Sequence, residues 1–114
     1  MNESPVAVGS AEIFEVKVMN MDYPIVPDTH RFSHEEAMEV YQMALQSPRT
    51  SRILVDLHHA SDATTSGFAR LVLLRKILRA EGRDLCLVNL RERVAKLYQI
   101  NRLHDVLPNV DLPN

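Results

Sequence analysis

Apolar residues along the chain follow the period of strands in some segments and of helices in others. Residues 13–19 alternate between apolar and charged side chains, which predicts a first strand with one buried face. Residues 21–29 contain two prolines, so we expect only an irregular or edge strand there. Residues 53–57 and 85–90 are nearly continuous apolar runs, the pattern of strands that are covered on both faces.

Other segments carry apolar residues three and four positions apart, the spacing of an amphipathic helix. Residues 34–46 are the first of these, and Ser33 with Glu36 forms a capping-box pattern at the start. Residues 64–80 are the second, and their apolar stripe is interrupted only at Arg75. The sequence therefore predicts one helix before the strand at residues 53–57 and another after it.

A third helix is predicted after the last strand. Asn89 and Glu92 would cap its start, and it would end near Asn101. Strands that alternate with helices of this length imply parallel pairing through right-handed crossovers. The predicted fold class is α/β, a small sandwich with a mixed, mainly parallel central sheet of about four strands under covering helices. Residues 1–11 lack periodicity, so we expect a flexible segment before a single domain over residues 12–114.

Composition narrows the possible classes of protein. The length of 114 residues and the 46% of hydrophobic residues suit one domain with a sizeable core. A formal net charge of −2 lacks the basic excess of a nucleic-acid binder, so no nucleic-acid partner is expected. The lone Cys86 lies in an apolar run, which predicts a buried thiol in a reducing compartment. No apolar stretch approaches the roughly 20 residues of a membrane span, and the polar start does not resemble a signal peptide, so we expect a cytoplasmic protein without direct membrane insertion.

The segment over residues 62–68 is the main candidate for function, because it joins the carboxyl end of a predicted central strand to the start of a helix. Thr64, Thr65 and Ser66 can cap the unpaired amide groups of that helix, which explains them without any activity. The same helix start also stabilises negative charge. A phosphate on one of these hydroxyls would add about −1.5 to −2 charges and could repel an acidic or apolar partner face.

Several short motifs follow one another in a fixed order over residues 53–108: Ile53-Leu54-Val55-Asp56-Leu57, Thr65-Ser66-Gly67-Phe68, Glu81-Gly82, Leu85-Cys86-Leu87-Val88-Asn89-Leu90 and Arg93-Val94-Ala95-Lys96-Leu97. This ordered set resembles the STAS domain, a family that includes bacterial anti-sigma factor antagonists. The chain departs from the family pattern at Thr64, which stands where the family has an aspartate, and in lacking the usual glycine-containing turn near residues 19–24. The resemblance is therefore to a divergent member.

The resemblance implies a non-enzymatic regulatory module of protein interaction. Its phosphoacceptor would be Ser66, with Thr65 as the alternative, and its partner a serine kinase that doubles as an anti-sigma factor. The kinase would supply ATP and magnesium, so no cofactor is expected in this chain, which would be a monomer or weak dimer. The resemblance also allows a constitutive accessory subunit of a membrane lipid-transport ATPase, with Thr65 as an interface residue. The implied partner-binding residues are Asp56, Asp62, Thr64, Thr65, Ser66, Gly67 and Arg70.

Two kinds of chemistry compete with this interpretation. Asp56, His58, His59 and Asp62 are ligand-type side chains within a short segment, but adjacent histidines rarely converge on one ion, so no metal site is expected. Ser66 with a histidine and an aspartate could imitate a hydrolytic triad. The segment lacks the Gly-x-Ser-x-Gly elbow, and we therefore expect no catalytic residues.

Overall fold

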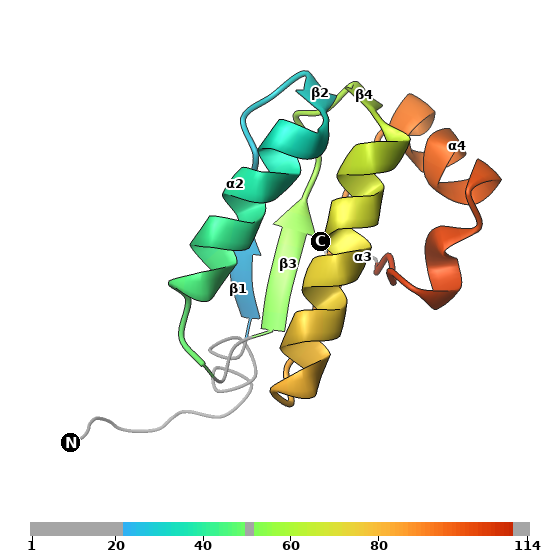
Figure 1. The fold of residues 1–114 in the computed structure, drawn as a ribbon. Helices are drawn as coiled ribbons and strands as arrows, with labels where there is room; N and C mark the ends of the chain where they lie inside the picture. Colours follow the sequence, from blue (N-terminus) through green and yellow to red (C-terminus); the bar gives the residue numbers. More distant parts are fainter. Residues whose placement is uncertain (1–21, 50–51, 111–114) are drawn as a thin grey trace, which may run out of the picture.

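The computed structural model describes residues 22–49 and 52–110, which form a parallel sheet with helices packed against it (Figure 1). The strand predicted over residues 13–19 and the flexible segment over residues 1–11 lie outside the described residues. Within the described part, the α/β class with a mainly parallel sheet and covering helices is confirmed.

The central sheet contains β1 (Asp22–Ile25), β3 (Arg52–Asp56) and β5 (Leu85–Val88) in the order β1-β3-β5, and both neighbouring pairs are parallel. All four side chains of β5 are buried, as the continuous apolar run predicts for a strand covered on both faces. In the described sheet β1 takes an edge position, which agrees with the expectation for this segment, because Pro24 has no N–H to donate and an edge strand is paired on one side only.

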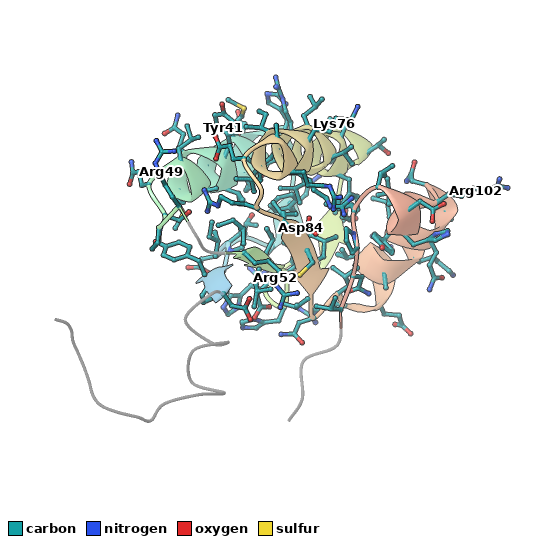
Figure 2. All side chains as sticks on the ribbon, turned by 90° about the horizontal axis from the view of Figure 1, so that it is seen from below. Tyr41, Arg49, Arg52, Lys76, Asp84 and Arg102 are labelled. Atoms are coloured by element: carbon teal, nitrogen blue, oxygen red, sulfur yellow. The ribbon has the colours of Figure 1, made fainter. Side chains whose placement is uncertain are left out.

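Helices α2 (His34–Leu45) and α3 (Thr65–Ala80) lie side by side on one face of the sheet, and both are close to their predicted bounds (Figure 1). Seen from below, they form one layer, while α4 (Glu92–Ile100) and the 3-10 helix η1 (Leu103–Asp105) lie beside the sheet (Figure 2). Each of α2 and α3 connects two parallel strands. Their first residues therefore lie at the same end of the molecule, where the parallel strands finish.

The start of α2 has the capping box that the sequence predicts. The carboxylate of Glu36 accepts hydrogen bonds from the Ser33 N–H at 2.9 Å and from the Ser33 hydroxyl. These two hydrogen bonds lower the pKa of Glu36. The chain therefore enters α2 in one fixed direction.

The predicted cap of the third helix is wrong. Helix α4 begins at Glu92 after Arg91, and Asn89 lies outside it in the left-handed region with a φ of 58°. The Asn89 side-chain amide instead donates to Asp56 Oδ2 at 3.1 Å. Asparagine is one of the residues that tolerates this backbone conformation, so Asn89 serves the turn after β5 rather than the helix.

A second pair of parallel strands, each of two residues, joins the starts of α2 and α3. Strands β2 (Arg31–Phe32) and β4 (Asp62–Ala63) pair in register, and the Thr64 N–H donates to the Phe32 carbonyl at 2.9 Å. Because α2 follows β2 and α3 follows β4 almost immediately, this pairing sets the relative position of the two helix starts.

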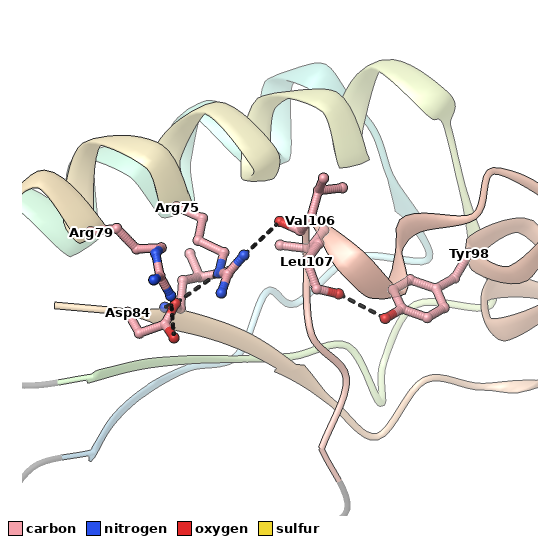
Figure 3. A network of polar contacts seen from close by, with 7 residues as sticks. Arg75, Arg79, Asp84, Tyr98, Val106 and Leu107 are labelled. Carbon is pink, nitrogen blue, oxygen red and sulfur yellow. Dashed lines mark hydrogen bonds and ion pairs between the residues drawn. The ribbon is translucent and has the colours of Figure 1, made fainter.

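Arg75, the polar break in the stripe of α3, ties three elements together (Figure 3). Its Nε donates to Asp84 Oδ1 at 2.7 Å and its Nη1 donates to the Val106 carbonyl at 3.2 Å. The Tyr98 hydroxyl donates to the next carbonyl, that of Leu107, at 2.7 Å. These contacts of Arg75 and Tyr98, called the clasp below, hold the segment after η1 through side chains of both α3 and α4.

Beyond that clasp, the chain adds a short bridge to the outer edge of β5. The Leu87 N–H donates to the Pro108 carbonyl at 2.7 Å, and the Val110 N–H donates to the Leu87 carbonyl at 2.9 Å. Cys86 in the same strand is a buried free thiol, as predicted, and burial raises its pKa.

Acid should weaken the clasp at Asp84. Desolvation alone would raise the pKa of this carboxyl, but hydrogen bonds from Arg75 and the Leu85 N–H outweigh it and lower the pKa. Because the folded pKa lies below the unfolded one, the stabilisation is complete above the unfolded pKa and is lost as the pH falls below about 4. We expect Asp84→Asn to be less stable than wild type at pH 7 by about 1 kcal/mol, after allowance for solvent screening.

Urea titrations at a series of pH values check this prediction, with the Asn variant showing a shallower loss of stability between neutral and acid pH. A matched control is Asp105→Asn, because that carboxylate is largely exposed and lies 3.6 Å from the exposed His104. If the Asp84 variant and wild type lost stability in parallel, the clasp would not respond to acid.

Candidate functional site

Thr64 caps α3. Its backbone is extended, with φ −115° and ψ 155°, and its hydroxyl accepts a hydrogen bond from the Gly67 N–H at 3.0 Å. Its carbonyl accepts from the Phe68 N–H at 3.2 Å. The structural explanation given above for hydroxyl residues at a helix start therefore applies to Thr64.

Ser66 and Thr65 lie in the first turn of α3, and both are exposed. The Ser66 Oγ lies 3.1 Å from the Thr64 Oγ1. The first turn contains no acidic residue, and within the described part of the chain the N–H groups of Thr65 and Ser66 form no hydrogen bond. A negative group on either hydroxyl would meet free amide donors and the positive end of the helix dipole. The role of Ser66 or Thr65 as phosphoacceptor stays a prediction.

Gly67, the next residue, is buried against β2. A Cβ at this position would lie 2.8 Å from the Phe32 carbonyl oxygen and 3.1 Å from the carbonyl carbon and oxygen of Ser33. Real Cβ atoms do not approach backbone so closely, so α3 can start where it does only with glycine here. The chain's own packing explains this glycine, and its contact with a partner stays a prediction.

Asp56 closes the turn after β3. Its Oδ1 accepts from the His58 N–H at 3.0 Å and lies 2.8 Å from His58 Nδ1, while its Oδ2 accepts from Asn89. Desolvation raises its pKa, but these hydrogen bonds outweigh it and lower the pKa. The carboxylate thus joins the ends of β3 and β5. Asp62 Oδ1 accepts from the neighbouring Ala63 N–H at 2.9 Å.

The two histidines lie on the exposed turn after β3, with ring centroids 3.9 Å apart. Residues 22–49 and 52–110 contain no group of three or more histidine, cysteine, aspartate or glutamate side chains that could hold a metal ion. The side-chain neighbour of Ser66 Oγ there is Thr64, and neither His58 nor His59 forms a hydrogen bond with it. The described residues therefore do not assemble the hydrolytic arrangement considered above.

An exposed stripe runs along α3 from Ser66. The α3 outer stripe consists of Ser66, Arg70, Leu73 and Ile77, which are spaced four, three and four residues apart and so share one helix face. Leu73 is 49% exposed and Ile77 is 40% exposed. Arg70 Nε donates to Nδ1 of His34 on α2 at 3.2 Å, so the stripe lies on the side of α3 that is turned toward α2.

Leu73, Ile77 and His34 are not among the residues that the sequence motifs mark as candidates. Two apolar residues outside the buried arc of an otherwise amphipathic helix were the available signal for the first two. His34 had no such signal, because its contact with Arg70 joins residues that are far apart in the chain.

The model of the STAS domain family matches residues 18–112, and the chain therefore belongs to this family. Membership makes it a small module of protein interaction or regulation, a class of domain without enzymatic activity of its own.

Among solved structures, the chain is similar to murine solute carrier 26 family member A9, an anion transporter solved in the inward-facing state. The TM-score is 0.61 with 13% sequence identity, over 75% of this chain and 14% of the transporter chain. At that identity the likeness concerns the fold. A search of curated proteins found no match. No helix in the described residues is long and apolar enough to cross a membrane.

Proposed function

We propose that this STAS domain is a regulatory module of the anti-sigma factor antagonist type. Its partner would be a cytoplasmic serine kinase that also acts as an anti-sigma factor, and phosphorylation of Ser66 would weaken the complex. The observation that carries the proposal is the position of Ser66, an exposed hydroxyl that begins the α3 outer stripe and is followed on the same face by exposed Leu73 and Ile77.

In the unmodified state, Leu73 and Ile77 give the partner an apolar surface, and Ser66 lies at its edge. Burial of an exposed apolar side chain at an interface is favourable at roughly 25 cal/mol for each Å² removed from water. Phe68 and the other inward-facing side chains of α3 are already committed to the core, so docking on this face requires no change in the fold. Binding of the kinase would release the sigma factor.

In the modified state, the kinase has transferred the γ-phosphoryl group of ATP to Ser66 Oγ, the hydroxyl proton has been lost and ADP has left. The phosphate carries about −1.5 to −2 charges at pH 7. The start of α3 tolerates it, because the first turn has no acidic residue and two free N–H groups. A partner surface that packed against the neutral hydroxyl must then desolvate this charge, which weakens the complex while the domain stays folded.

Substitution of Ser66 tests the switch. We expect Ser66→Asp to weaken binding to the cognate kinase at least about tenfold, because a fixed negative charge would replace the neutral hydroxyl at the edge of the interface. Ser66→Ala should retain near wild-type affinity and lose regulation by ATP. Isothermal titration calorimetry measures both, and urea unfolding should place both variants within about 0.5 kcal/mol of wild type, since the position is exposed.

Thr65→Asp is the matched control, because it puts the same charge on the neighbouring exposed hydroxyl of the same turn. If Thr65→Asp weakened binding and Ser66→Asp did not, Thr65 would be the acceptor. Unchanged affinity in both aspartate variants would contradict a charge switch at this helix start.

The second candidate is a constitutive accessory subunit of a membrane lipid-transport ATPase. The exposure of Thr65 favours it, because this hydroxyl can serve in an interface without any modification. Affinity purification from the native cell, combined with intact-mass measurement, separates the two candidates. An unmodified domain that copurifies with an ATPase supports the second candidate, whereas a kinase partner and a singly phosphorylated domain support the first.

A further inference from the structure

The three arginines of α3 differ in their partners. Arg75 and Arg79 both pair with Asp84, at 2.7 Å and 3.4 Å. Arg70 has no carboxylate partner within the described residues, although its guanidinium carries a full positive charge. It lies one helical turn after Ser66, and both side chains belong to the α3 outer stripe.

The guanidinium of Arg70 is held on one side and open on the other. Its Nε donates to His34 Nδ1 at 3.2 Å, so this ring nitrogen acts as the acceptor. In the described part of the chain, the two Nη groups of Arg70 donate to no acceptor. These groups form the planar fork that binds a phosphate through two parallel hydrogen bonds.

We propose that Arg70 is the internal receptor for a phosphate on Ser66. Residues four apart on a helix have Cβ atoms about 5 to 6 Å apart, and long side chains lean toward the helix N-terminus, so the Nη groups can reach a phosphate on Ser66. The bond from Nε to His34 can persist, because the end of the fork alone provides the two donors. The inference rests on the proposed function for the presence of the phosphate.

Other charged groups at this end of the molecule are engaged, of the wrong sign or, in the case of Arg31, on a different element. Glu36 accepts from Ser33, and Asp62 accepts from the Ala63 N–H. Glu35 in the first turn of α2 is negative, and Arg31 in β2 lies before the capping box rather than on α3. Arg70 is thus the cation that shares a helix face with Ser66.

The consequence concerns the docking surface. In the unmodified domain, Arg70 stands between Ser66 and Leu73 and offers its Nη groups to a partner carboxylate. After phosphorylation the same groups bind the phosphate. The modification would then act twice on the α3 outer stripe, since it adds a negative charge and also occupies the neighbouring positive one.

The test measures the second ionisation of the phosphate, whose ordinary pKa is about 6. Phosphoserine is incorporated at position 66 of the full chain during translation, and its ³¹P resonance is titrated in the wild type and in Arg70→Gln. We expect the pKa of the phosphate to be lower in the wild type by about half a unit to one unit, because an adjacent guanidinium stabilises the dianion. Arg70→Lys should give an intermediate value, since it keeps the charge and loses the fork.

Lys76→Gln is the control, because it removes the same charge from an exposed position further along α3. Its phosphate should titrate as in the wild type. Equal phosphate pKa values in the wild type and Arg70→Gln would overturn the proposal. So would a change in the phosphate pKa in Lys76→Gln as large as that in Arg70→Gln, because it would mean that the phosphate responds to the net positive charge of the domain rather than to Arg70. An amide NMR spectrum verifies that each variant is folded. Because the phosphate is installed without a kinase, failure of this test leaves the Ser66→Asp binding result standing, and the reverse also holds.

Discussion

Replacement of Phe68 by alanine should lower the free energy of unfolding by about 3 to 5 kcal/mol. Phe68 is 1% exposed and belongs to the main core, and its ring meets that of Tyr98 edge to face with centroids 6.2 Å apart. The substitution removes buried ring surface, leaves a cavity under the first turn of α3 and deletes an aromatic contact between α3 and α4.

Urea unfolding followed by circular dichroism measures this effect. Leu73→Ala is the matched control, because Leu73 lies on the same helix and is 49% exposed, so its loss should cost less than about 1 kcal/mol. If Phe68→Ala lowered the free energy of unfolding by less than about 1 kcal/mol, the core would not anchor α3 at this point.

Gly67→Ala should destabilise the domain by about 1 to 3 kcal/mol, although alanine is the better helix former by about 1 kcal/mol. The new Cβ would lie 2.8 Å from the Phe32 carbonyl oxygen, and that carbonyl cannot move freely because it accepts a hydrogen bond from the Thr64 N–H. The clash must therefore be relieved by a shift of α3 away from β2.

Ser66→Ala provides the comparison one residue earlier, where the side chain is exposed and no such contact exists. Thermal and urea unfolding should show a lower stability for Gly67→Ala than for Ser66→Ala. Higher stability of Gly67→Ala than of wild type would show that helix propensity dominates and that the approach to β2 is loose. A shift of α3 would also displace Ser66, so Gly67→Ala should weaken partner binding beyond its effect on stability.

Most of the fold could be predicted because the signals were local. The apolar runs of β3 and β5 and the periodic residues of α2 and α3 lie within each element, and the capping box at Ser33 needs only two residues three apart. Strands β2 and β4 have two residues each, too few to show a period, and they form only because separate segments meet.

The error at Asn89 has a similar origin. Asn89 and Glu92 have the spacing of a cap, but the side chain of Asn89 is engaged by Asp56, which lies on another strand. A contact between residues so far apart in sequence competes with the local pattern and cannot be read from it. The function of Arg75 was hidden for the same reason, since its partners are Asp84 and the carbonyl of Val106.

In the candidate site, too, the features that depend on neighbouring residues could be predicted and those that depend on distant contacts could not. The sequence located the hydroxyl cluster of residues 64–66 and its place at a helix start, because both follow from neighbouring residues. It did not reveal that Gly67 is required by Phe32, or that His34 holds Arg70, since these contacts depend on how α2 and α3 are placed by β2 and β4.

The bridge of residues 108–110 along β5 also bears on aggregation. A strand edge with free N–H and C=O groups is a template on which another copy of a chain can add its own strand. Here Leu87 has both backbone groups paired with the chain's own Pro108 and Val110. At Leu87 the outer edge of β5 is therefore closed to a strand of a second copy, although the strand is wholly apolar and carries no charged gatekeeper of its own.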